Sequence, residues 1–282
     1  MIDAHIHVVP PNLPGVGPLS PGLRASPDNV ARVVREQMQA AGVTHAAAMG
    51  AWEAGPDDAL GVGRTLKIAE AVPGLYAIGI ADPKKSTPGH IQAAEKQIRA
   101  GRVVALKAYL GYLHHFPNDP GYLPYYELAA NYKLPVFFHT GDTYSPMAKL
   151  KYAQPLGVDE VAVDFPAVQF VLCHCGNPWT VDAAEVVYKN MNVWTDLSGL
   201  MVGSEEDFTE ATESQGRRDV VERIRLAFRY AERPNRFVYG SDWPLAPMNA
   251  YAAFIREAIP QEFHDMVFVE NARKLFGERL RV

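Results

Sequence analysis

The stretch IDAHIHVVPPNLPGVGPLSPG, residues 2–22, joins a strand pattern to the loop that follows it. Its first seven residues alternate as a strand does, with Asp3, His5 and His7 on one face and Ile2, Ala4, Ile6 and Val8 on the other. A doubly wound sheet is expected to carry a glycine-rich phosphate loop after its first strand. The prolines that follow here cannot line up amide groups for a phosphate, because proline has no N–H. The stretch therefore favours a barrel over an open nucleotide-binding sheet.

Short β-branched and aromatic runs recur along the chain, each followed by a segment with helical spacing. The expected strands span residues 2–8, 44–51, 75–81, 103–109, 136–139, 168–174, 193–197 and 237–240. The expected helices span residues 27–41, 61–71, 87–100, 122–132, 158–164, 182–189, 217–231 and 248–258. The second expected strand is rich enough in alanine to be helical instead. Eight such units without a break in composition predict an α/β protein with one domain, residues 1–282, folded as a (β/α)8 TIM barrel.

Charge and composition exclude several classes of partner. The net charge of −5 comes from acidic and basic residues that are mixed along the chain, so we expect neither a nucleic-acid partner nor a membrane surface. No apolar run is long enough for a membrane helix, and no signal-peptide pattern precedes the first expected strand. Two cysteines are too few for a secreted disulfide framework. We expect a cytoplasmic protein that acts on a small molecule.

Lone polar residues mark the ends of several expected strands. His139 and His174 end the fifth and sixth, Asp242 follows the eighth, and His5 and His7 lie in the first. In a barrel the carboxyl ends of the strands meet at one face, so four imidazoles and a carboxylate are expected to converge there. Such donors suit Zn²⁺, with Mn²⁺, Fe²⁺ or Co²⁺ as alternatives. Taken alone, the two histidines of the first strand are equally explained by one hydrogen-bonded core residue and one exposed residue.

This pattern resembles the amidohydrolase superfamily, specifically the amidohydrolase-related group that is often called amidohydrolase 2. The resemblance rests on DAHIH, on the histidines and Asp242, and on a terminal VFVENARKLFG, and it spans residues 2–277. It implies that His5, His7, His139 and Asp242 hold a metal, with His174 beside it.

Lys107, near the end of the fourth expected strand, leaves the number of metals open. In many members of the wider superfamily a lysine at this place is carboxylated and bridges two metals, and Lys107 and His174 would then be ligands. The alternative is an interior lysine that pairs with an acid such as Asp3, or that binds a substrate carboxylate.

The resemblance also implies an enzyme, a metal-dependent hydrolase that activates water for attack on an amide, lactone or ester of a small molecule. The aromatic residues and loop lysines after the strands indicate that this molecule is planar or acidic. Asp242 would accept the proton of the water and pass it to the leaving group, while His174 would hydrogen-bond to the water or the oxyanion. The alternative reaction is decarboxylation of an aromatic or muconate-type acid, and Lys107 favours hydrolysis. A metal-free lactonase and a non-enzymatic binding barrel are further alternatives, and a homodimer is one expected form.

Side chains after the expected strands are candidates for substrate binding, because aromatic rims stack planar molecules. The candidates are Lys107, Tyr109, Tyr112, Trp179 and Trp243, with Lys149 or Lys151 as an anchor for a carboxylate. The CHC run at residues 173–175 is not expected to bind a metal, because alternation in a regular strand directs both sulfurs away from the face of His174. We expect Cys173 and Cys175 to be free core residues.

Overall fold

The computed structural model describes residues 1–55 and 57–280. Eight parallel strands pair in chain order in one sheet. They are β1 (Ile2–His7), β2 (His45–Met49), β3 (Leu75–Ile80), β4 (Val103–Ala108), β5 (Val136–Phe138), β6 (Phe170–Leu172), β7 (Val193–Asp196) and β8 (Phe237–Val238). Beyond β8 the chain returns to β1, where the His7 amide donates to the Trp243 carbonyl at 2.7 Å and the Asp242 amide donates to the His5 carbonyl at 2.9 Å. These hydrogen bonds bring the last strand against the first and complete the barrel.

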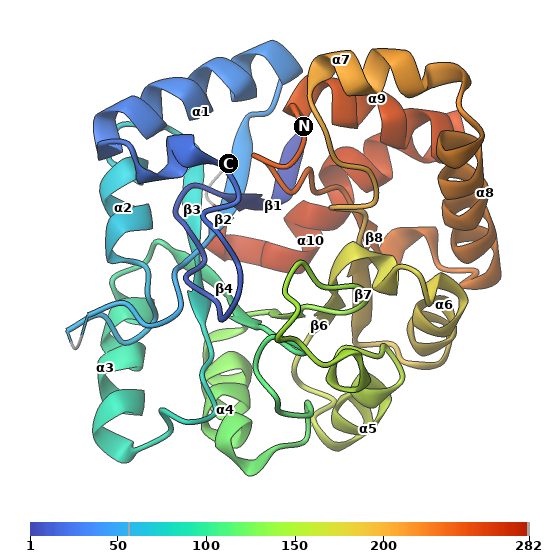
Figure 1. Ribbon diagram of the computed structural model, residues 1–282. Coiled ribbons are helices and arrows are strands. Elements are labelled where there is room, and N and C mark those ends of the chain that lie inside the picture. Colours follow the sequence, from blue (N-terminus) through green and yellow to red (C-terminus); the bar gives the residue numbers. More distant parts are fainter. Residues whose placement is uncertain (56, 281–282) are drawn as a thin grey trace.

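The helices form a ring around the strands (Figure 1). They are α1 (Pro27–Ala41), α2 (Gly63–Ala69), α3 (Pro88–Arg99), α4 (Leu123–Tyr132), α5 (Gly157–Asp164), α6 (Thr180–Lys189), α7 (Glu205–Glu210), α8 (Gln215–Tyr230), α9 (Met248–Ala258) and α10 (Asn271–Phe276). The first helix shows why the boundaries are readable from sequence. The Ser26 side chain caps its first turn, Pro27 follows at the first position, and Gly42 ends it in the left-handed conformation. The predicted (β/α)8 barrel is confirmed.

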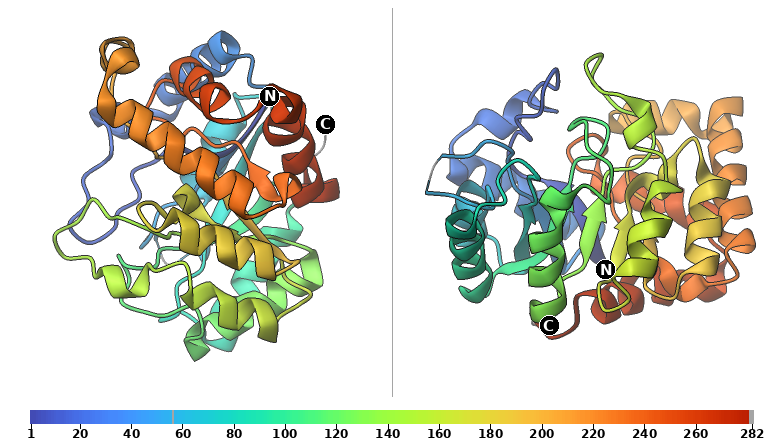
Figure 2. Two further views of the ribbon diagram at one scale, coloured as in Figure 1. Left: turned by 90° about the vertical axis from the view of Figure 1, so that its right-hand side faces the viewer. Right: turned by 90° about the horizontal axis from the view of Figure 1, so that it is seen from below.

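Two helices lie outside the predicted pattern. The short helix α7 begins at a reciprocal capping box between Ser204 and Asp207, inside a segment that the sequence pattern leaves as a loop. Helix α10 lies at the end of the barrel opposite the long loops, as the right-hand view of Figure 2 shows. The alanine-rich β2 is a strand, because it lies between β1 and β3 and is hydrogen-bonded to both.

The predicted alternation in β1 is wrong, because a register shift between Asp3 and Ile6 interrupts the pairing of β1 with β2. Ile2 and Ala4 belong to the interior cluster that contains Phe137, whereas Ile6 packs outward with residues of α1. The two apolar pairs of this strand therefore face opposite sides of the sheet.

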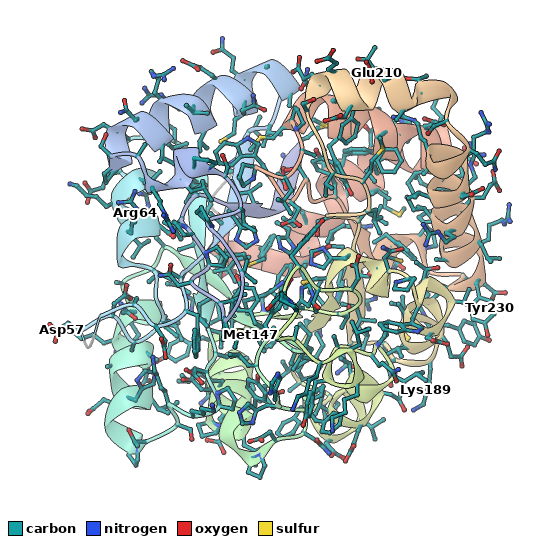
Figure 3. The ribbon with its side chains drawn as sticks, viewed as in Figure 1. Asp57, Arg64, Met147, Lys189, Glu210 and Tyr230 are labelled. Carbon is teal, nitrogen blue, oxygen red and sulfur yellow. The ribbon has the colours of Figure 1, made fainter. Side chains whose placement is uncertain are left out.

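Two long connections roof the carboxyl end of the barrel, one after β1 and one after β5. They cross the centre of Figure 1 in dark blue and green. The Ser145 hydroxyl donates to the Pro14 carbonyl at 2.7 Å and joins the two connections. Gly15 permits this approach, since its φ is +71° and a Cβ there would lie 2.3 Å from Ser145 Oγ. Met147, which belongs to the second connection, lies near the centre of the view in Figure 3.

Nowhere in residues 1–55 and 57–280 is there a helix with the length and apolar character needed to cross a membrane.

Candidate active site

A cavity of about 40 Å³ lies under the roof, which is room for a few water molecules. Most of the predicted site residues line it, namely His5, His7, Lys107, Tyr109, Tyr112, His139, His174 and Asp242. They come from the carboxyl ends of β1, β4, β5, β6 and β8, so the barrel brings together residues that are far apart in the sequence. All eight side chains belong to buried residues.

Asp196, at the end of β7, connects three parts of this site. Its Oδ2 lies 2.8 Å from His5 Nδ1. Its Oδ1 accepts hydrogen bonds from the His174 amide at 2.8 Å, from the Ser198 amide at 3.0 Å and from the Ser198 hydroxyl at 2.5 Å. The residue is completely buried, and although burial alone raises its pKa, His5 and His174 lower the pKa below that of an ordinary aspartate. Asp196 is therefore an ionised carboxylate that orients both histidines.

The contacts of three histidines determine which ring nitrogen carries a lone pair. His5 Nδ1 faces a carboxylate, His139 Nε2 lies 2.8 Å from the Asp142 carbonyl, and His174 Nδ1 lies 3.1 Å from the Ser198 carbonyl. A carbonyl or carboxylate oxygen only accepts, so in the neutral form of each ring this nitrogen is the N–H. The other nitrogen of each ring then presents a lone pair.

His139 Nδ1 and His174 Nε2, the two lone-pair nitrogens of their rings, lie 3.2 Å apart. Two acceptors at this distance repel each other unless a cation or a proton lies between them. Two nitrogens bound tetrahedrally to one zinc ion at ordinary bond lengths lie about 3.3 Å apart. The spacing of these two rings fits a shared metal ion, and it equally fits one N–H···N hydrogen bond.

A second group of donors surrounds Asp242. Its Oδ1 lies 3.5 Å from His5 Nε2 and 3.3 Å from His7 Nε2. Among the described residues, Asp242 Oδ1 and His7 Nδ1 are buried polar atoms without a hydrogen-bond partner. Buried groups are normally satisfied, so an unpartnered carboxylate oxygen between two imidazoles indicates room for a ligand.

Burial keeps the imidazoles of His5 and His139 neutral. It lowers the pKa of His5 to about 4, with a further contribution from Lys107, and it lowers the pKa of His139 well below the ordinary value, with a further contribution from His174. Burial raises the pKa of Asp242, but the imidazoles of His5, His174 and His7 outweigh it and hold that pKa below the usual range. Neutral imidazoles and an ionised carboxylate are the forms that bind a divalent metal.

Two sets of three donors lie close enough to hold one ion within the described part of the chain, His5 with His7 and Asp242, and His5 with His174 and Asp196. The nitrogen that His5 turns toward Asp196 is already in a hydrogen bond, which favours the first set. His139 belongs to neither set and contacts His174 instead. The structure thus brings together three of the four predicted metal ligands and places the fourth beside the predicted catalytic histidine.

Lys107 does not contact Asp3. Its ammonium group donates to Cys173 Sγ at 2.9 Å and lies 5.3 Å from the centre of the Tyr109 ring. Cys173 faces the barrel interior on the same side as Val171, whereas His174 and Cys175 adopt left-handed conformations, with φ of 59° and 47°, that end the regular strand and let His174 line the cavity as well. The prediction that the Cys173 sulfur points away from the site is therefore wrong, whereas both cysteines are free and buried as expected.

The predicted substrate-binding residues divide into two groups. Tyr109 and Tyr112 line the cavity, and the rings of Tyr112 and His139 lie 4.7 Å apart. Trp179 and Trp243 do not line it, and Trp243 packs in the cluster between β1 and α1. Each tryptophan follows its site residue along the chain, but the local turn directs its side chain elsewhere. Lys149 and Lys151 are exposed and do not line the cavity either.

Sequence reasoning missed Asp196, Ser198 and Gly199. Asp196 had the same signal as the other site residues, since it is the one acidic residue at the end of an apolar run, VWTDL. Gly199 lies against the site with a φ of +64°, and a Cβ there would lie 2.8 Å from both Asp242 Oδ2 and His174 Nδ1. A larger residue at this position would block the approach of these two side chains.

Comparison with solved structures finds the same architecture. An amidohydrolase from Burkholderia multivorans with bound zinc is 18% identical, with 98% of each chain covered and a TM-score of 0.70. A probable 2-pyrone-4,6-dicarboxylic acid hydrolase from Acinetobacter baumannii is 15% identical over 98% of each chain, with a TM-score of 0.67. A 5-carboxyvanillate decarboxylase from Sphingomonas paucimobilis is 16% identical over 98% of each chain, with a TM-score of 0.58. At these identities the likeness shows the fold alone.

A search of curated proteins finds no match. The family model described as amidohydrolase matches residues 2–277, which is nearly the whole chain. Together with the barrel and the cluster of imidazoles and carboxylates at its carboxyl end, this match establishes that the chain belongs to the amidohydrolase family.

Proposed function

We propose that this protein is a metal-dependent hydrolase that cleaves a lactone, ester or amide bond in a small molecule. The observation that carries the proposal is Asp242 Oδ1, which has no hydrogen-bond partner among the described residues and lies 3.5 Å from His5 Nε2 and 3.3 Å from His7 Nε2. His139 Nδ1 and His174 Nε2 lie 3.2 Å apart beside it. His5, His7 and Asp242 would hold the metal, and His139 and His174 would complete its surroundings. Zinc suits this mixture of imidazole and carboxylate donors.

A divalent ion held here would polarise a substrate carbonyl and make water acidic enough to react near neutral pH. Asp242 is the proton acceptor, because it is ionised and its Oδ1 has no hydrogen-bond partner among the described residues. It can then return the proton to the leaving group. His174, held by Ser198 and Asp196, directs its Nε2 toward the same space and positions the reacting groups. The roof excludes bulk water from this region.

Decarboxylation of an aromatic or muconate-type acid is the second candidate, and the decarboxylase fold neighbour is the observation that supports it. In that reaction Asp242 or His174 would protonate the carbon that loses carbon dioxide. The buried Lys107 favours hydrolysis, in keeping with the superfamily pattern that the sequence resembles.

The test combines metal analysis with a substrate panel. Purified protein reconstituted with zinc or manganese is expected to hold at least one equivalent of metal by elemental analysis. A panel of lactones, amides and aromatic acids is then followed for acid release and for carbon dioxide, in water labelled with ¹⁸O. Hydrolysis transfers the label to the product, whereas decarboxylation does not.

A matched pair of variants ties the result to the site. His139→Ala is expected to lose activity, whereas His45→Gln, at the amino end of β2, is expected to keep it. Protein that holds no metal after reconstitution, or an active His139→Ala variant, would contradict the proposal.

A further inference from the structure

Building on the proposed hydrolase function, we infer that the substrate carries no charge and is apolar except for the lactone, ester or amide group that reacts. Analogues that carry a carboxylate are excluded. The inference rests on the composition of the roof, on the charges around the cavity and on one unpartnered hydroxyl group.

The first of the two roof connections, after β1, contributes almost no charge. Residues 8–23, which form most of the connection after β1, contain no acidic or basic side chain. Leu13, Val16 and Leu19 from this connection line the cavity. Leu13 and Val16 also pack with Tyr109 and Tyr112, so the roof joins the wall through apolar contacts. A substrate under this roof meets hydrocarbon and aromatic rings.

The remaining walls offer little compensation for a substrate carboxylate. Asp142 and Asp242 line the cavity and are acidic, and Lys107 is the one lysine or arginine among the described residues that line it. The Lys107 ammonium group lies against Cys173 Sγ at 2.9 Å, inside the barrel and away from the roof. Lys151 instead lies over the Tyr152 ring at 4.7 Å. With the proposed metal ion engaged by the reacting carbonyl, a carboxylate elsewhere on the substrate would be buried without a cationic partner. Such burial is strongly disfavoured, so a carboxylated substrate would be rejected.

Tyr109 supplies the polar contact that a neutral substrate can use. Its hydroxyl is buried and has no hydrogen-bond partner among the described residues, although the residue lines the cavity. A tyrosine hydroxyl is a hydrogen-bond donor as well as an acceptor. A carbonyl or ring oxygen of a neutral lactone or ester is a suitable acceptor.

The test uses two lactones that differ in one charge, dihydrocoumarin and the same molecule with a ring carboxylate. Zinc-loaded protein is expected to hydrolyse dihydrocoumarin with a kcat/KM about 100-fold higher than that for the carboxylated lactone. The reason is that burying an unpaired charge costs free energy, and each factor of ten in kcat/KM corresponds to about 1.4 kcal/mol. Val16→Arg places a cation in the roof and is expected to reduce this preference at least about tenfold. Val16→Gln, of similar length but uncharged, is the matched control and is expected to keep the wild-type preference.

Tyr109→Phe provides a second arm. It is expected to lower kcat/KM for the neutral lactone about tenfold by removing one hydrogen bond, while the circular dichroism spectrum and melting temperature stay those of wild type. Equal or faster hydrolysis of the carboxylated lactone would overturn the inference and leave the hydrolase proposal intact. If neither lactone is hydrolysed, the hydrolase proposal loses its support, and calorimetric binding of the two probes tests the inference. Tighter binding of the carboxylated probe, or no binding of either, would then overturn it.

Discussion

The two ends of the barrel interior are built on opposite principles. Toward the amino ends of the strands the interior is apolar, with Ile2, Ala4 and Phe137 packed together and Phe276 of α10 stacked on Phe137 at 6.1 Å. Toward the carboxyl ends it holds imidazoles, carboxylates and a lysine, some of whose buried atoms have no hydrogen-bond partner in the described part of the chain. The first end is satisfied by packing, whereas the second has polar atoms available to a ligand.

This difference teaches where stability and function reside. Substitutions at the apolar end are expected to change the free energy of unfolding and leave ligand affinity alone. Substitutions at the polar end are expected to change affinity more than they change folding. Four experiments test this separation.

Phe276→Ala is expected to have the largest effect on stability. The side chain is 1% exposed and stacks on Phe137, so its loss leaves a cavity and costs about 3–5 kcal/mol of unfolding free energy. Denaturant unfolding measures this loss. Zinc affinity of the folded fraction is expected to equal that of wild type, and a large drop in that affinity would show that the two ends are coupled.

Zinc addition is the next largest effect. A ligand that binds only the folded state at a concentration 100-fold above its dissociation constant stabilises that state by about 2.7 kcal/mol. Thermal unfolding is therefore expected to shift upward with zinc and to return after chelation, for wild type and for His45→Gln. His5→Ala removes a central donor and is expected to abolish the shift. A full shift in this variant would contradict the proposal that His5 binds the metal.

Asp196→Asn tests the residue that orients the histidines. An amide has one acceptor oxygen, so it cannot serve both His5 Nδ1 and the donors from His174 and Ser198. Zinc affinity is expected to fall 10- to 100-fold, by about 1.4–2.7 kcal/mol, as for other residues that hold metal ligands in place. Calorimetry with the exposed Asp28→Asn as control measures the change. An unaltered zinc affinity would show that Asp196 does not position the metal ligands.

Lys107→Met is expected to have the smallest effect. It replaces a buried cation whose ammonium group contacts a thiol by a side chain of similar volume, so the free energy of unfolding is expected to change by less than about 1 kcal/mol. Metal content by elemental analysis is expected to stay unchanged. A fall from two equivalents to one would instead identify Lys107 as a carboxylated ligand that bridges two metals.

The barrel could be predicted because each strand is a short apolar run with a helical segment after it, and these local patterns survive in the fold. The side-chain directions at the site could not, because they depend on breaks in regularity. A register shift in β1 decides where His5 points, and left-handed residues after β6 decide where His174 points. Alternation along an ideal strand contains neither feature. The hydrogen-bonding role of Asp196 is likewise set by partners from β1 and β6, which no local pattern shows.

The closure of the barrel has a consequence for how the site comes into being. His5 and His7 belong to the first strand and Asp242 follows the last, so these three donors meet only where the chain returns to its beginning. During synthesis the first histidines have no carboxylate to share a metal with until almost the entire chain has emerged. High metal affinity is therefore expected only for the completely folded barrel, and an incomplete chain is expected to bind the ion weakly.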